Sequence, residues 1–468
     1  MNKPGRWLFP TLLFIAMQGT AQTTKDNAVI PLLVDGSIKK QVVDGLGVNA
    51  NTRSWNGTEL EPALQLLLDT LKATIWRVVV ETVEKWEDVN DNNDPFVYNW
   101  AYYDSLYETP KFRKVWGMIA YLNQQGITKN LMINFMGYVP KWMGEETINP
   151  DKEDEYVEML TSFFYYAKNK KQLRIGLVSP TNESDWRKEG PKLDPQHYAS
   201  VMRKLVVRMK LMGMDDIFYV GPDPADMKRG INEYIPELMK DSVIMARMAH
   251  FGVHSYGGYY ADIDAMLKGS PYPRSDFWVT EWNDWRDGLD DGVLGIYDYK
   301  FAAACVNHML DLLQHGATAL MVWEGYDSYY EHHAPSPFSY WGILAYNKQQ
   351  GTYTARKHLY AISQVSAFII PGTRQIGNAL NTDSVRVLSF YDDAAAKNLV
   401  ITGINRRKTS VRLSTRLVHV PDIDQFEMYV TDEQVNLQRK PDIRVTRQQA
   451  TVVIPPDCIF TLKAILKK

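Results

Sequence analysis

Cysteine is scarce in this chain, which has only two, Cys305 and Cys458, among 468 residues. Cys305 lies in an apolar helical pattern and Cys458 in a strand-like one, and both patterns are typical of buried thiols. So few cysteines exclude a disulfide scaffold, although an oxidising compartment would permit one bridge between them. We predict two free thiols.

Long hydrophobic runs are missing beyond the amino terminus. The first apolar run, from Trp7 to Met17, follows two basic residues and precedes small ones. A run of this length is too short to span a bilayer and is typical of a secretory signal peptide, which we place at residues 1–21. We therefore expect an exported protein, periplasmic or extracellular, without membrane insertion.

The chain also lacks a strong charge of either sign. Lys and Arg number 52, Asp and Glu 55, and the formal net charge is −3. This balance gives no reason to expect a nucleic acid or an anionic membrane as a partner. A hydrophobic content of 45% and a charged content of 23% are typical of a globular protein with a large core.

Common ligand-binding signatures are absent as well. No Gly-rich phosphate loop follows any strand-like segment, which weakens the case for a nucleotide-binding fold. The histidines of "EHH" (331–333) lack the HExxH spacing, and the acidic stretches 90–94 and 284–291 lack the spacing of a calcium loop. We predict neither a metal site nor a cofactor.

An alternation of short apolar runs with longer amphipathic segments organises most of the chain. The short runs, rich in β-branched and aromatic residues, are 42–49, 74–80, 130–135, 174–179, 217–221, 250–256, 277–282 and 319–325. Segments with helical periodicity lie between many of them. Eight such units predict an α/β fold, a (β/α)8 TIM barrel over residues 42–365, with a doubly wound open sheet as the alternative.

The periodicity changes after the barrel. From residue 366 the segments are short, β-rich and separated by turn residues, which predicts an all-β, sandwich-like domain over 366–468. Residues 22–41 contain two short strands around an Asp-Gly turn, and they have no partners of their own. We expect these strands to join the second domain, and the two domains to pack rigidly because no low-complexity linker separates them.

Two glutamates follow strands at the edge where barrels place catalytic groups. Glu183 follows the fourth predicted strand in "TNE", and Glu281 ends the seventh in "VTEW". A closed barrel brings both to one face. Glycoside hydrolysis needs two such carboxyl groups: one protonates the leaving oxygen, and the other attacks the anomeric carbon or activates water. Either glutamate alone would suit a salt bridge or a loop cap, but the pair favours this chemistry.

Other side chains near these strand ends could support the pair. His254 and Tyr256 share one side of the sixth strand, where they could hold the carboxylates and tune their pKa values, although a core histidine is an alternative. Arg77 stands inside an apolar strand and requires an anion, and we expect this anion to be the nucleophile carboxylate. Trp282 and Trp323 could offer rings to a sugar face.

Several motifs resemble those of glycoside hydrolase family 30. They are "VVDGLGVN" (42–49), "YVPKWMG" (138–144), "PTNE" (180–183), "TEW" (280–282) and the helix-to-sheet segment "LYAISQVSAFIIPGTRQI" (359–376). In that family they are the opening motif, the loop after the third strand, the acid/base motif, the nucleophile motif and the last helix leading into a side β-domain. The resemblance thus implies a barrel of this family's clan with a β-domain beside it.

The resemblance also implies roles for individual residues. Glu183 would be the acid/base, Glu281 the nucleophile, Asn182 a contact to the sugar 2-hydroxyl, and Trp142 part of a subsite. The implied reaction is retaining and passes through a covalent glycosyl-enzyme, with the carboxyl groups about 5–5.5 Å apart.

Two cleft regions depart from the family pattern, namely the first loop (45–55) and the loop after the nucleophile (282–292). The sugar, the linkage and endo or exo action therefore stay open among glucan, xylan and galactan, and fold-level analogy suggests a β-1,6-linked galactan or glucan. The alternative is a non-catalytic barrel that binds glycan. We expect a monomer.

Overall fold

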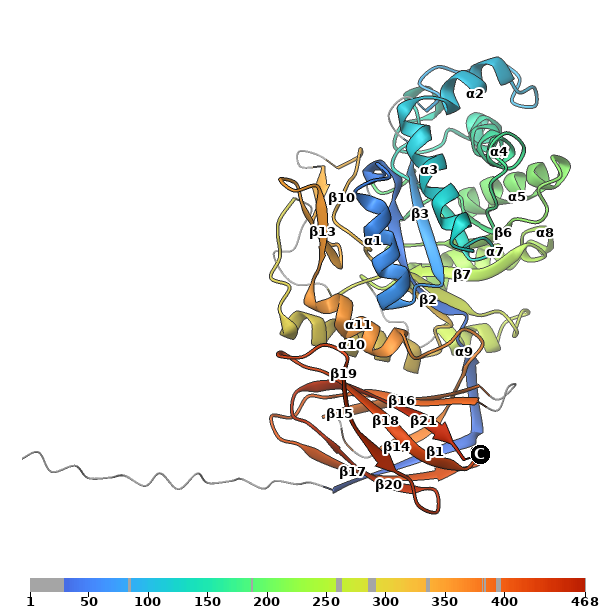
Figure 1. Cartoon of the computed structure of the whole chain (residues 1–468). Coiled ribbons are helices and arrows are strands. Elements are labelled where there is room, and N and C mark those ends of the chain that lie inside the picture. The colour runs from blue at the N-terminus through green and yellow to red at the C-terminus, as the bar shows by residue number, and fades with distance from the viewer. Residues whose placement is uncertain are drawn as a thin grey trace, which may run out of the picture.

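The computed structural model describes most of the chain (Figure 1). The described residues are 29–82, 86–186, 188–257, 263–284, 292–333, 337–380, 382, 384–392 and 397–467. The predicted signal peptide and most of the acidic stretch 284–291 lie outside them. No helix in this described part combines the length and apolar character needed to cross a membrane.

Eight parallel strands close into a barrel, which confirms the predicted fold and excludes the open sheet. The strands are β2 (Gly45–Asn51), β3 (Ile75–Glu81), β4 (Leu131–Met136), β5 (Leu177–Ser179), β6 (Phe218–Pro222), β7 (Met248–His254), β8 (Phe277–Trp282) and β9 (Ala319–Val322). Closure occurs where β2 pairs with β9, with Gly47 opposite Met321. Because helices cover the outside, both faces of these strands are buried, and their sequences are almost continuously apolar.

Helices follow most of the barrel strands and wrap them. They are α1 (Leu60–Leu66), α2 (Trp100–Tyr107), α3 (Pro110–Gln124), α4 (Glu153–Asn169), α5 (Pro195–Leu211), α6 (Met227–Arg229), α7 (Ile235–Leu238), α8 (Ser242–Met245), α9 (Ile263–Lys268), α10 (Tyr299–Gln314) and α11 (Lys357–Ser366). Local sequence sets their starts: Asp194 caps the backbone N–H of His197 ahead of Pro195 in α5, and Asp298 caps α10.

Shorter elements complete this domain. Three turns of 3-10 helix (Thr52–Ser54, Lys141–Met143, Pro150–Lys152) and two of π-helix (Leu67–Leu71, Gly230–Tyr234) lie in the connections. Two small hairpins between β9 and α11 were not predicted: β10 (Ser328–Tyr329) pairs with β11 (Phe338–Ser339), and β12 (Leu344–Asn347) with β13 (Thr352–Ala355). The buried ion pair of Arg356 with Asp327, at 2.6 Å, fixes the base of the second hairpin.

The predicted all-β domain is confirmed as one nine-stranded sheet. Its strands are β1 (Val29–Val42), β14 (Arg374–Leu380), β15 (Val385–Asp392), β16 (Lys397–Asn405), β17 (Val411–Val418), β18 (Ile423–Thr431), β19 (Gln438–Arg444), β20 (Gln449–Ile454) and β21 (Cys458–Leu466), in the order β19-β18-β21-β16-β15-β14-β1-β17-β20. One cluster of buried apolar side chains draws on strands from both halves, so the sheet folds over on itself to enclose a core.

The amino-terminal segment joins this sheet as a single strand. β1 pairs antiparallel with β14 and parallel with β17, so the expectation of two short strands around an Asp-Gly turn was wrong. Asp35 accepts hydrogen bonds from the backbone and hydroxyl of Ser37, which accommodates a bulge, and the strand continues beyond it.

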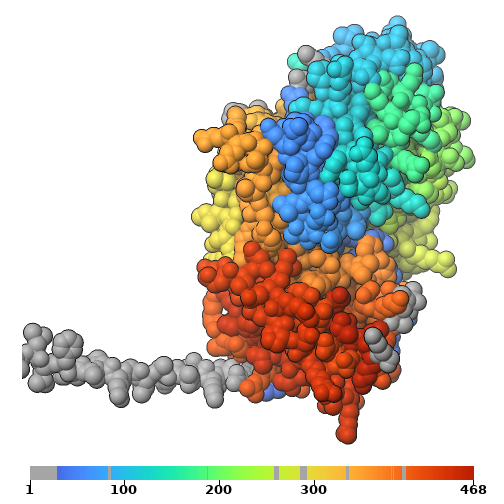
Figure 2. Space-filling view, in the orientation of Figure 1, coloured from blue at the N-terminus to red at the C-terminus, as the bar shows by residue number. Residues whose placement is uncertain are grey.

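The two domains contact each other through α10 and α11, beneath which the β-domain lies (Figures 1 and 2). The hydroxyl of Thr431 donates to Gln364 at 2.8 Å, and Arg386 forms an ion pair with Asp311. Cys305 and Cys458, one in each domain, are buried and not joined in a disulfide, as predicted.

Two neighbouring valines of β20 test the folded-over sheet. Val452 is fully buried opposite Leu413, whereas Val453 is 51% exposed. Val452→Ala should lower the free energy of unfolding by roughly 2 kcal/mol, because two buried methyl groups are lost and a cavity forms. Val453→Ala is the matched control and should change it far less. Urea unfolding followed by circular dichroism measures both, and equal losses would contradict this core.

Candidate active site

The inside of the barrel changes from apolar to polar along the strands. The lower layer is a cluster of buried apolar side chains, Ile75, Met132, Leu177, Val220, Trp278, Ala319 and Met321. Inward-facing positions recur every two residues. Two positions further along four of these strands, the side chains are polar and fully buried: Arg77, Asn134, Ser179 and Thr280. This polar layer is the floor of the site.

Arg77 is the centre of the floor. Its Nη1 donates to Oδ1 of Asn49 at 2.8 Å and to Oε1 of Glu281 at 2.5 Å. Its Nη2 donates to Oδ1 of Asn182 at 2.6 Å and to Oδ2 of Asp223 at 3.1 Å. A buried guanidinium requires compensating anions, and two carboxylates provide them here. Arg77 thereby orients groups from four other strand ends.

Asp223 is a member of this network that sequence reasoning missed. Besides Arg77, its carboxylate accepts hydrogen bonds from the hydroxyls of Ser179 and Thr280, both at 2.6 Å. Its backbone carbonyl accepts from the amide of Glu183 at 3.0 Å. Asp223 follows the fifth barrel strand, so the positional rule that singled out Glu183 would have found it.

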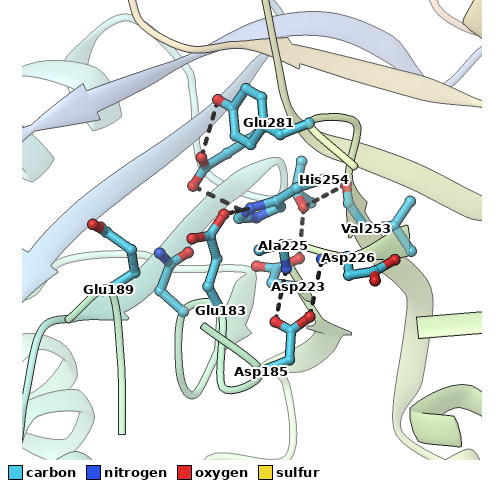
Figure 3. Close-up of polar contacts among 12 residues, drawn as sticks. Glu183, Asp185, Glu189, Asp223, Ala225, Asp226, Val253, His254 and Glu281 are labelled. Atoms are coloured by element: carbon cyan, nitrogen blue, oxygen red, sulfur yellow. Dashed lines mark hydrogen bonds and ion pairs between the residues drawn. The ribbon is translucent and has the colours of Figure 1, made fainter. Parts of the chain in front are cut away.

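Glu183 and Glu281 lie together above this floor (Figure 3). Oε1 of Glu183 is 2.7 Å from Nδ1 of His254, whose Nε2 lies 3.5 Å from Oε1 of Glu281. The hydroxyl of Tyr256 donates to Oε2 of Glu281 at 3.3 Å. One oxygen from each glutamate and a ring nitrogen of His254 all lie within 4.8 Å of one another. The barrel therefore brings together the predicted residues of strands four, six and seven.

The surroundings of the two glutamates differ. Burial raises the pKa of Glu281 to about 7, against the opposing effects of His254 and Arg77. Burial also raises the pKa of Glu183 well above its usual range, and there the charges of Glu189 and Asp185 add to the effect. Burial lowers the pKa of His254, which favours a neutral ring. Glu183 is thus the carboxyl group that keeps its proton, and Glu281 the one that loses it first.

A pocket of about 540 Å³ opens above the pair. Aromatic side chains form much of its wall: Trp186, Tyr256, Trp323 and Trp341. Glu189 and Asp226 add two carboxylates beside Glu183 and Glu281. Trp186 is 61% exposed, unusual for so large an apolar ring.

Arg77 and His254 do not line this pocket themselves but contact Glu281 and Glu183, whereas two other predicted residues, Trp142 and Trp282, have no part in the site. The pairing register of β8 shifts between Val279 and Trp282, so the adjacent Thr280 and Glu281 both face the inside and Trp282 lies outside, parallel to the ring of His308 and 1% exposed. The indole N–H of Trp142 donates to the carbonyl of Glu87 at 2.6 Å, and its ring is absent from the pocket wall.

Trp186, Glu189, Asp226 and Trp341 were missed by sequence reasoning. They lie on loops after strands, where no periodicity indicates direction.

Glu183, His254 and Glu281 are close enough together to offer ligands to a metal ion. However, Oε1 of Glu281 already accepts a hydrogen bond from the Arg77 guanidinium, whose positive charge opposes a second cation at that place. The donor set therefore fits proton transfer and nucleophilic attack better than metal binding.

The raised pKa of Glu281 predicts a pH-dependent cost to stability. The folded protein holds this proton up to about pH 7, while an ordinary glutamate loses it near 4.5. Since the folded state binds the proton more tightly, its stability falls as pH rises through this window. The free energy of unfolding of Glu281→Gln should therefore rise relative to that of the wild type between pH 4.5 and 7.5, by on the order of 2 kcal/mol.

Thermal unfolding at several pH values measures this difference. Glu61→Gln, at an exposed site of α1, is the control and should show a difference from wild type that does not grow with pH. A gap between Glu281→Gln and wild type that stays constant with pH would contradict the buried, proton-retaining carboxyl group.

No family model and no curated protein sequence matches this chain. Solved structures do match. A family 30 endoxylanase from Clostridium papyrosolvens is 18% identical, with a TM-score of 0.70 over 93% of this chain and 99% of that one. The family 30 xylanase C of Talaromyces cellulolyticus is 16% identical, with a TM-score of 0.70 over 93% of this chain and 100% of that one. An endo-β-1,6-glucanase is 13% identical, with a TM-score of 0.67 over 92% of this chain and 94% of that one. In fold, this chain is similar to the family 30 glycoside hydrolases, as its motifs led us to expect.

Proposed function

We propose that this protein is a retaining glycoside hydrolase that cleaves β-glycosidic bonds in an oligosaccharide or polysaccharide. The observation that carries this proposal is the pair Glu183 and Glu281, with carboxyl oxygens within 4.8 Å of each other in one pocket. A separation of about 5–5.5 Å suits direct nucleophilic attack, whereas inverting enzymes need about 6.5–9.5 Å to admit a water molecule.

In the first step, ionised Glu281 attacks the anomeric carbon while Glu183 gives its proton to the leaving oxygen. The bond from carbon to the leaving oxygen breaks, and an ester bond from carbon to Glu281 forms. Arg77, 2.5 Å from Oε1 of Glu281, stabilises the ionised nucleophile. Tyr256 holds the other oxygen of Glu281 in place.

In the second step, Glu183 accepts a proton from water, and the resulting oxygen attacks the same carbon. The ester bond to Glu281 breaks, so the sugar regains its original configuration and both carboxyl groups return to their starting states. His254, hydrogen-bonded to Glu183 at 2.7 Å, keeps its carboxyl group aimed into the pocket in both steps. Asn182, held by Arg77, is positioned to contact the sugar 2-hydroxyl.

We infer an uncharged glycan as substrate, with a β-1,6-linked glucan or galactan as the first candidate. Rings line the pocket and suit the apolar faces of sugars, while none of its described lining residues is Lys or Arg, which an acidic sugar would require. The endo-β-1,6-glucanase among the similar structures supports the linkage. The sequence of residues 1–21 and the similarity to an exported protein from Bacteroides fragilis support an exported enzyme.

A product screen tests the reaction and its stereochemistry. Wild type and Glu281→Ala are incubated with β-1,6-glucan, β-glucans of other linkages, xylans and galactans, and the products are separated by chromatography. We expect the wild type to cut one of them and Glu281→Ala to cut none. Proton NMR of the first products should show the β-anomer. Binding of a glycan by both proteins without any cleavage would favour the non-catalytic barrel instead.

The residual activity of the Glu183→Ala variant should depend on the leaving group of the substrate, and that of the Glu281→Ala variant should not. Glu183→Ala should keep partial activity on substrates such as glycosyl fluorides, whose leaving group needs no proton, whereas Glu281→Ala should be inactive on every substrate. Steady-state rates with an oligosaccharide and the fluoride of the same sugar measure this. Equal residual activities in the two variants would remove the role assignment.

A further inference from the structure

The segment "EHH" (331–333) follows the last barrel strand and lies beside the pocket, whose wall includes His333. The ring of His332, 3% exposed, lies between two carboxylates. Its Nδ1 is 2.6 Å from Oε1 of Glu81, and its Nε2 is 2.9 Å from Oε2 of Glu189. Glu189 is part of the pocket wall, as is Glu183, near which Figure 3 draws it. A buried chain of three charged groups thus ends at the pocket.

Each member of this chain is fixed in place. Glu81 ends β3, and its Oε1 also accepts from the backbone amides of Glu331 at 2.6 Å and His332 at 3.1 Å. The carbonyl of Glu189 accepts from the amide of Gly137 at 2.8 Å. The ends of β3 and β4 and the segment that follows β10 therefore hold the Glu189 segment against the cleft.

The electrostatics of the chain favour a protonated histidine between two ionised glutamates. Burial alone would lower the pKa of His332, but Glu189 and Glu81 raise it to about 10. Burial raises the pKa of Glu189, yet His332 and, to a smaller extent, His333, whose Nε2 is 3.7 Å from Oε1 of Glu189, more than offset this, so the net pKa falls below the usual range. The same balance of burial and His332 lowers the pKa of Glu81.

We propose that Glu81 and His332 keep the Glu189 carboxylate ionised on the pocket wall, and that Glu189 is a positioning residue whose negative charge keeps Glu183 protonated. This inference rests on the proposed function, because a protonated Glu183 is what the first step requires. Glu189 does not touch the reacting atoms in this scheme and acts only through Glu183.

Other charges also face Glu183, and they do not replace this one. They are His254 from β7, Arg77 from β3, Asp223 after β6, Glu281 from β8 and Asp185 from its own turn. Arg77 favours the ionised form of Glu183, and Asp223 lies against Arg77. Asp185 accepts from the backbone amides of Ala225 and Asp226 at 2.8 and 2.9 Å. After burial, Glu189 has the largest effect in raising the pKa of Glu183.

Glu189→Gln tests this role through the pH profile of kcat/KM. Removing the negative charge lowers the pKa of Glu183, so the alkaline limb should move to lower pH by about one unit with an oligosaccharide substrate. Above that limb, kcat/KM falls about tenfold at a given pH. With a glycosyl fluoride as substrate, the alkaline limb should stay at the same pH in Glu189→Gln, since that leaving group needs no proton. Glu145→Gln, at an exposed loop position, is the matched control and should leave the profile in place.

His332→Asn extends the test along the chain. Without the imidazolium the pKa of Glu189 rises, while His333 remains beside it, so this variant should move the limb in the same direction as Glu189→Gln and by no more. Combined with Glu189→Gln, it should add no further shift, because both changes remove the same charge. A purely structural role would lower the thermal midpoint or kcat without moving the limb, and that result would overturn the proposal.

Titration of the carboxyl groups separates this inference from the proposed function. Carbon-13 NMR of glutamate-labelled protein, with Glu183→Gln to identify the signal, follows the protonation of Glu183 without any turnover. A lower pKa of Glu183 in Glu189→Gln supports the inference even if the screen finds no substrate. An unchanged pKa in folded Glu189→Gln overturns it, whatever the screen shows.

Discussion

The site depends on one buried cation. Arg77 lies inside the barrel with no exposure, and a charge in that position is tolerated only with ionised partners and satisfied hydrogen bonds. Glu281 and Asp223 provide the negative charge, and Asn49 and Asn182 accept one further hydrogen bond each from Nη1 and Nη2. Because these partners come from different strands, the requirement of one guanidinium sets the relative positions of groups that are far apart in the sequence.

The Arg77 guanidinium also makes the electrostatic surroundings of the two glutamates different. Glu281 contacts Arg77 directly, so its ionised form is stabilised despite burial. Glu183 has no such contact; it meets His254 on one side and the negative charge of Glu189 across the pocket. Two carboxyl groups with the same chemistry thus hold a proton with different strength: burial raises the pKa of both, but that of Glu281 only to about 7. That difference is what a general acid and a nucleophile require at the same pH.

The sequence predicts those parts of the protein that follow from strand periodicity. The barrel strands, the all-β domain and the clustering of Glu183, Glu281 and Arg77 at one end of the barrel follow from apolar runs and from the rule that parallel strands end at one face. Strand periodicity does not predict the direction of side chains on loops or at irregular positions of a strand. Trp282 was expected in the pocket, but an irregularity in the register of β8 turns it outward, and Glu189 was overlooked because its partner, His332, lies far away in the sequence.

The contact between Glu189 and His332 shows why such loops resist prediction and yet matter for the chemistry. The loop after β5 carries the proposed acid/base, and the segment after β9 carries the histidine, so only the closed barrel places them together. Local sequence can neither specify nor reveal a charge pair of this kind. The effect proposed for it on Glu183 is nevertheless electrostatic and requires no contact with a substrate. Loops that bind different sugars could therefore change around a fixed catalytic pair, provided that the charge facing Glu183 is kept.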